Sequence, residues 1–136
     1  MFEHFVEAQE PVYGRVTAEL RAGKKTSHWM WFIFPQLSGL GSSPMAQRFA
    51  LAGLDAARAY LEHPILGSRL IASTRLVLAV EGRTAREIFG SPDDLKFGSS
   101  MTLFARAAPA EPVFREAIER YYGGIEDART LALLGL

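Results

Sequence analysis

Proline and glycine divide this sequence into short segments, and within each segment the apolar residues recur at helical spacing. Val12, Val16 and Leu20, for example, are four positions apart, which places them on one face of a helix. No segment alternates polar and apolar residues convincingly, as a half-buried strand would, although residues 49–54 are ambiguous. We therefore expect an all-α fold built from short helices.

Signals that start and end helices place the individual elements. Proline is favoured in the first turn, glycine just after the last turn, and Ser, Thr, Asp or Glu at the capping positions. The expected starts are Pro11, Ser43-Pro44, Thr84 with Glu87 as a capping box, Ser91-Pro92, Glu111-Pro112 and Asp127. The expected ends are Gly23, His63-Pro64 and Gly82. These boundaries predict roughly seven to nine helices.

Length and composition predict one compact domain over residues 1–136. The chain has 136 residues, about the size of one domain, and 49% of them are hydrophobic, which is enough for a core. We find no internal repeat and no interdomain linker. The chain has no cysteine, which excludes disulfides, thiolate catalysis and zinc sites with sulfur ligands.

Charge and hydropathy indicate which classes of partner and which cellular compartment to expect. Lys and Arg number 15, as do Asp and Glu, whereas a nucleic-acid binder usually has a basic excess, so we do not expect a nucleic-acid partner. The N-terminus does not resemble a signal peptide, and the longest apolar run, residues 29–35, is too short to span a membrane. We expect a cytoplasmic protein with no membrane partner. The histidines are not at metal-ligand spacing and no cofactor motif is present, so we expect neither metal nor cofactor.

The first candidate site is the segment 23–36, which contains both tryptophans of the chain and four aromatic residues within six positions. This density is typical of a core helix, with Met30, Ile33 and Phe34 buried and Ser27 as its N-cap. Lysines beside a helix start can hold an anion, and an indole can stack on a flat ring. Because the two indoles are two residues apart, we expect only one to line a pocket. The candidate residues are Lys25, Ser27, His28, Trp29, Trp31 and Gln36.

The second candidate site lies in residues 91–104. Helical spacing places Asp93, Lys96 and Ser100 along one strip, with Ser99 beside it. The other strip is expected to face the core and consists of Phe97, Met101 and Phe104. The polar strip could orient a ligand, or it could be a solvated face with a surface ion pair that contributes little.

These segments resemble the DUF1810 family along nearly the whole chain. The matching stretches are residues 5–9, Tyr13, residues 23–36, 45–47, 61–67, 88–90 and 93–104. The resemblance implies an all-helical fold, and the name of the family states that its function is unknown. Some members are labelled calpastatin, but an inhibitor of that type is a long disordered chain, whereas this composition forms a core.

Two functional hypotheses follow. In the first, the two segments line a pocket for a small anionic or nucleotide-like ligand: Lys25 and Lys96 bind the anion, an indole stacks on a ring, and Asp93 or His28 is the acid/base of a hydrolytic reaction. Helical proteins of the NADAR type, which process ADP-ribose conjugates, are similar in size and in their Trp, Lys and Asp content. In the second, the chain is a non-catalytic protein-interaction module. Whether it is an enzyme stays open, and whether the segments meet around a hollow discriminates between the hypotheses.

Overall fold

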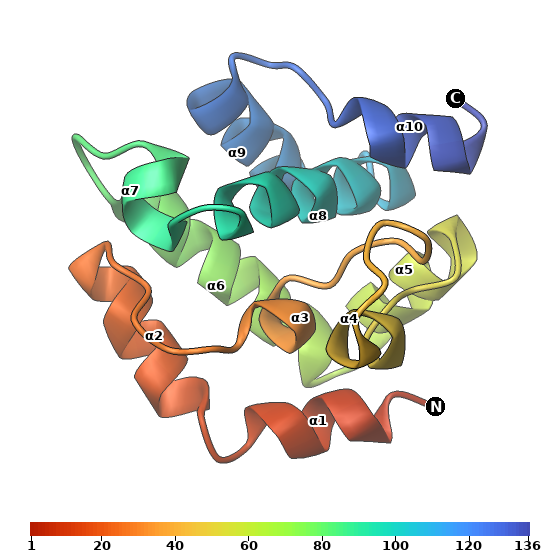
Figure 1. Cartoon of the computed structure of the whole chain (residues 1–136), viewed down its shortest axis with the longest axis horizontal. Coiled ribbons are helices and arrows are strands. Elements are labelled where there is room, and N and C mark those ends of the chain that lie inside the picture. Colours follow the sequence, from red (N-terminus) through yellow and green to blue (C-terminus); the bar gives the residue numbers. More distant parts are fainter.

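The computed structural model describes all 136 residues and contains ten helices and no strand, which confirms the all-α fold (Figure 1). The helices are α1 (Glu3–Gln9), α2 (Tyr13–Ala22), α3 (Met30–Ile33), α4 (Pro44–Arg48), α5 (Leu54–Glu62), α6 (Leu66–Ala79), α7 (Ala85–Phe89), α8 (Asp93–Ala107), α9 (Pro112–Tyr122) and α10 (Ala128–Leu134). The ambiguous residues 49–54 form one isolated β-bridge, from Leu51 to Leu37. The expected number of helices, seven to nine, was therefore too low.

Most of the expected helix boundaries are confirmed by hydrogen bonds. Thr84 and Glu87 form the reciprocal capping box of α7. The side chains of Ser43 and Asp127 accept bonds from backbone amides in the first turns of α4 and α10. Gly23 ends α2 in the left-handed conformation that favours glycine.

Three expected boundaries were wrong. Pro11 lies in the turn between α1 and α2, because residues 3–9 form a separate helix that buries Phe5 and Gln9. Ser91 does not cap α8: the residue at the N-cap is Pro92, with no side-chain bond. The end of α6 is Ala79, three residues before Gly82.

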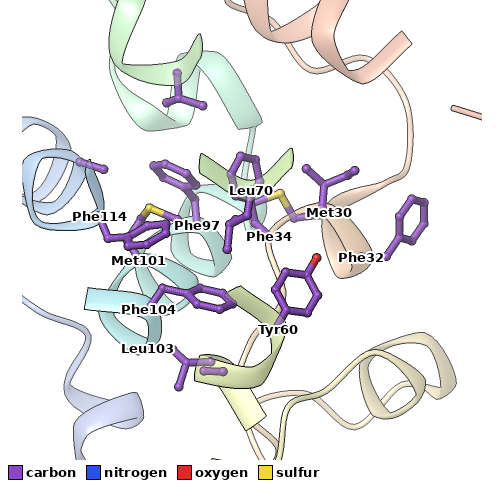
Figure 2. Close-up of a cluster of buried hydrophobic side chains, with 14 of the residues drawn as sticks. Met30, Phe32, Phe34, Tyr60, Leu70, Phe97, Met101, Leu103, Phe104 and Phe114 are labelled. Carbon is purple, nitrogen blue, oxygen red and sulfur yellow. The ribbon is translucent and has the colours of Figure 1, made fainter. Parts of the chain in front are cut away.

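The central helix α8 is surrounded by α5, α7, α9 and α10, and it runs across the middle of Figure 1. Phe97, Met101 and Phe104 are fully buried, which confirms the expected core strip. Figure 2 shows them in the buried cluster together with Phe34. The ring of Phe34 packs edge-on against Phe97 with centroids 4.9 Å apart, an arrangement that aromatic rings favour. This packing joins α8 to the aromatic segment of the first candidate site.

The aromatic segment forms only one turn of helix, Met30–Ile33. Proline at position 35 ends it, because the residue before a proline is disfavoured in the helical conformation. Met30, Ile33 and Phe34 are buried, as expected. Ser27 is not the N-cap: that position is Trp29, and the Ser27 hydroxyl instead donates to Glu19 on α2.

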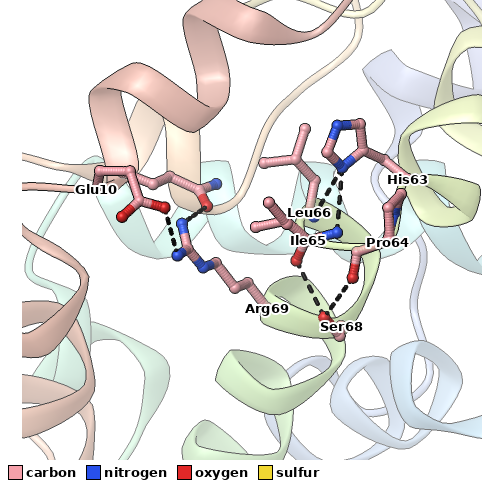
Figure 3. A network of polar contacts seen from close by, with 8 residues as sticks. Glu10, His63, Pro64, Ile65, Leu66, Ser68 and Arg69 are labelled. Atoms are coloured by element: carbon pink, nitrogen blue, oxygen red, sulfur yellow. Dashed lines mark hydrogen bonds and ion pairs between the residues drawn. The ribbon is translucent and has the colours of Figure 1, made fainter.

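A polar network joins the N-terminal helices to α6 (Figure 3). Nδ1 of His63 accepts hydrogen bonds from the amides of Ile65 at 3.2 Å and Leu66 at 3.3 Å, so this imidazole caps the start of α6. Arg69 then reaches across to the α1–α2 junction, where it bonds Glu10 at 2.8 Å and Gln9 at 3.2 Å.

None of the ten helices combines the length and the apolar character that crossing a bilayer requires.

Candidate functional site

The two candidate segments meet at Asp93, the first residue of α8. One oxygen of the Asp93 carboxylate is 2.9 Å from Nζ of Lys25, and the other oxygen is 3.6 Å from Nζ of Lys96. The side chains of Lys25 and Asp93 are 7% and 20% exposed, so this pair is largely withdrawn from water. Lys96 is 29% exposed and has the longer contact. Of the two lysines, Lys25 is therefore held more firmly by Asp93, and Lys96 is the more accessible to solvent.

Each of these ammonium groups also lies near an indole. Nζ of Lys25 is 5.1 Å from the centroid of Trp29, and Nζ of Lys96 is 5.5 Å from that of Trp31, both within the range of cation–π attraction. We call these five residues the Asp93 cluster. The cluster holds both tryptophans and two of the three lysines of the chain, and the third lysine, Lys24, is exposed and adjacent to Lys25.

The loop before Trp29 is held by a buried carboxylate that the sequence analysis did not single out. Glu19 accepts hydrogen bonds from the amides of Thr26 at 2.8 Å and Ser27 at 3.1 Å, from the Ser27 hydroxyl at 2.6 Å and from the Trp29 indole at 2.9 Å. Burial raises the pKa of Glu19, but these four bonds outweigh it and lower the pKa to about 2. Ser27 and Trp29 thus direct their polar groups at Glu19.

A signal for Glu19 was present in the sequence. Glu19 lies three residues after Val16 and immediately before Leu20, on the apolar face of α2. A carboxylate on a buried face is costly unless it is fully bonded, so its position implied a set of nearby donors. Which donors these were depended on how the loop 23–29 folds back on α2, and local spacing does not encode this.

The other candidate residues lie at different depths. Ser99 donates to the carbonyl of Leu95 within α8 at 3.1 Å, and the buried hydroxyl of Ser100 has no hydrogen-bond partner. His28 is exposed, and its side chain forms no hydrogen bond or ion pair. Gln36 is half-buried, and its backbone carbonyl accepts from the amide of Leu51. The structure therefore brings together Lys25, Asp93, Lys96 and the two indoles. His28 makes no hydrogen bond or ion pair with them, and Gln36 meets the cluster only at Trp31, with which it lines a small cavity.

The hollows of the surface lie mainly elsewhere. None of the five best-formed hollows is lined by Lys25, Asp93 or Lys96. Trp31 and Gln36 line a cavity of about 20 Å³, which has room for about one water molecule. No group of three or more His, Cys, Asp or Glu side chains is arranged to hold a metal ion. The cluster therefore offers one accessible charge, that of Lys96, and among these five hollows it contributes only Trp31 to the smallest.

The fold and the cluster define an all-helical protein with a lysine–carboxylate–lysine arrangement between two indoles. The chain belongs to the DUF1810 family, described as "Protein of unknown function (DUF1810)", which matches residues 1–134. Its structure is similar to the crystal structure of the conserved hypothetical protein Rv1873 from Mycobacterium tuberculosis, with 58% sequence identity and a TM-score of 0.97. That similarity covers 99% of this chain and 96% of the other. No curated protein matches the sequence.

Proposed function

We propose that the Asp93 cluster binds a small anionic ligand, of which phosphates and nucleotides are the chemical type. The observation that carries this proposal is that Lys25 and Lys96, from segments about seventy positions apart, converge on one carboxylate. Within the cluster two ammonium groups face this one carboxylate, and that of Lys96 has the longer contact and the greater exposure. Lys24 adds a further exposed cation beside the cluster.

Lys96 is the residue that would engage the ligand. Its ammonium group is 3.6 Å from Asp93, longer than an ordinary hydrogen bond of this kind, and it is partly exposed. It can therefore turn towards an anion at lower cost than Lys25, whose 2.9 Å contact is more buried. In this proposal Lys25 and Asp93 position the site, and Lys96 contacts the ligand.

A flat ring of a ligand could stack on only one of the two indoles, that of Trp31. Trp29 is 1% exposed and donates its N–H to Glu19, whereas Trp31 is half-buried and lies below Lys96. A nucleobase would therefore lie over Trp31 at the surface and stay open to solvent. This favours modest affinity dominated by charge, which weakens as salt is added.

The geometry supports binding better than hydrolysis. Both carboxylate oxygens of Asp93 already contact ammonium groups, so a substrate would have to displace a lysine to reach either oxygen. His28, the other acid/base candidate, is exposed and has no partner that would orient it. We therefore propose a binding protein and assign no reaction to it.

A thermal-shift screen with NAD, ADP-ribose and nucleotides at low salt tests the proposal. Native protein should be stabilised by at least one of these ligands, and Lys96→Ala should lose most of that shift while folding normally. Arg129→Ala is the matched control, because Arg129 is an exposed cation on α10 without an ion pair. No shift of the native protein at millimolar ligand, or equal loss in both variants, would contradict the proposal.

The second candidate is the protein-interaction module. It is favoured by the observation that Lys25, Asp93 and Lys96 line none of the five hollows described above. In that case the anion that Lys96 meets is a carboxylate or phosphate on a partner protein. For an interaction module, free nucleotides should give no shift in the thermal-shift screen. In a separate capture experiment from a native extract, Lys96→Ala should weaken retention of a stoichiometric partner.

A further inference from the structure

A groove of about 630 Å³ runs between α2 and α6, away from the Asp93 cluster. The residues that matter for its chemistry are Tyr13, Arg21, Ile71, Arg75, Leu76 and Glu111. Ile71 and Leu76 are partly buried against the core and leave some apolar surface in the groove. Neither the anion-binding proposal nor the packing of the core uses this surface.

The two helices that form the groove run parallel. At one end, the hydroxyl of Tyr13 lies 3.3 Å from that of Ser73. At the other end, a side chain placed at Gly23 would meet Val80 at 3.0 Å, so the C-terminal ends of α2 and α6 also adjoin. Arg21 and Arg75 both lie beyond the Tyr13–Ser73 contact, towards these C-terminal ends. The positive charge of the groove is therefore concentrated in one half of it.

These two arginines carry charge that the structure leaves unmatched. Arg21 and Arg75 are exposed, and neither has an ion pair or a side-chain hydrogen bond. By contrast, Arg69 at the other end of α6 is paired with Glu10. The only acidic lining residue, Glu111, directs its carboxylate to the amide of Val113 at the start of α9. The groove thus combines an apolar floor with two free guanidinium groups.

We propose that this groove docks an acidic amphipathic helix of a partner protein. Tyr13 and Arg21 are eight positions apart, which at 1.5 Å per residue gives about 12 Å, or about two helical turns. A helix of that length places apolar residues at i and i+4 against Ile71 and Leu76. Asp or Glu clustered at one end of this helix then reaches Arg21 and Arg75, which lie in one half of the groove.

Selection from a displayed library of helical peptides tests this proposal on the whole native chain. The library is counter-selected against the double variant Arg21→Glu/Arg75→Glu, and circular dichroism checks that this variant is folded. Enriched peptides should carry two apolar residues at i and i+4 with Asp or Glu clustered at one end. By fluorescence anisotropy they should bind the native protein at least tenfold more tightly than the double variant.

A charge-matched control separates the groove from general electrostatic attraction. Arg15→Glu/Arg129→Glu removes the same charge at exposed arginines that do not line the groove, and it should leave peptide affinity within about twofold. Failure to enrich any acidic amphipathic sequence would overturn the proposal. So would enriched peptides that bind both double variants equally. Lys96→Ala should not alter peptide binding, so this result is independent of the Asp93 cluster.

Discussion

The indole N–H of Trp29 donates to the buried carboxylate of Glu19 at 2.9 Å, and this bond ties the aromatic segment to α2. The same carboxylate takes three further bonds from Thr26 and Ser27. Lys25 precedes these residues directly, so Glu19 fixes the backbone from which Lys25 reaches Asp93. The position of the Asp93 cluster therefore depends on a residue that does not belong to it.

Replacing Glu19 by Gln should destabilise the protein by about 2–3 kcal/mol, because hydrogen bonds to a charged group contribute more than neutral ones and the amide cannot accept all four donors. Urea unfolding at pH 7 measures this loss. Glu7→Gln is the matched control, since Glu7 is exposed and has no bonded partner, and its effect should stay within about 0.5 kcal/mol. Equal effects of the two changes would show that the Glu19 network is not stabilising.

The Glu19 network should also make the free energy of unfolding depend on pH. The pKa of Glu19 is lowered from 4.5 to about 2 in the folded protein, so the folded state favours the ionised carboxylate. This contribution is fully present above pH 4.5 and is lost as the pH falls towards 2, with a total of about 3 kcal/mol. The difference in unfolding free energy between native protein and Glu19→Gln should therefore shrink between pH 5 and pH 3. A difference that does not change with pH would contradict this assignment.

Asp93→Asn should cost about 3 kcal/mol, because it leaves the largely buried ammonium group of Lys25 without its counter-charge. Lys96→Ala should cost less than about 1 kcal/mol, since its contact with Asp93 is longer and more exposed. Chemical denaturation of both variants at low salt provides the comparison. If Lys96→Ala proved the more damaging change, Lys96 rather than Lys25 would be the structural cation.

Ser100→Ala should raise stability by up to about 1 kcal/mol, because the buried hydroxyl of Ser100 has no hydrogen-bond partner. Thr102→Val provides the contrast. The hydroxyl of Thr102 donates to the Gly98 carbonyl and accepts from the Asp127 amide, so its loss should cost about 1–2 kcal/mol. Thermal unfolding of the two variants checks the opposite signs. A clear loss of stability in Ser100→Ala would indicate a bonded hydroxyl.

Much of the fold was predictable because helix caps are local. The capping box at Thr84 and the start at Asp127 depend on residues three positions apart, so sequence alone located them. The turn at Pro11 was misplaced because its position depends on α1 packing Phe5 into the core. Such tertiary packing overrides the local preference of proline for a first helical turn.

The candidate site was predictable in part. The strip of α8 that carries Asp93 and Lys96 follows from helical spacing, and the structure places these two residues in contact. The role of Ser27 did not follow from the sequence. Its hydroxyl bonds Glu19 on the preceding helix α2 instead of capping α3, and local spacing does not report that contact. How closely Lys25 approaches Asp93 did not follow either, because it depends on the packing of the loop before Trp29 and no local pattern reports it.

The most direct test of the Asp93 cluster is an NMR titration of the native protein with ADP-ribose and with inorganic pyrophosphate at low salt. Binding at the cluster should shift the backbone amides of Lys25, Asp93 and Lys96 and the indole signal of Trp31, in a saturable manner that added salt reverses. Shifts confined to other surfaces, or no saturable shift at millimolar ligand, would contradict anion binding at this site.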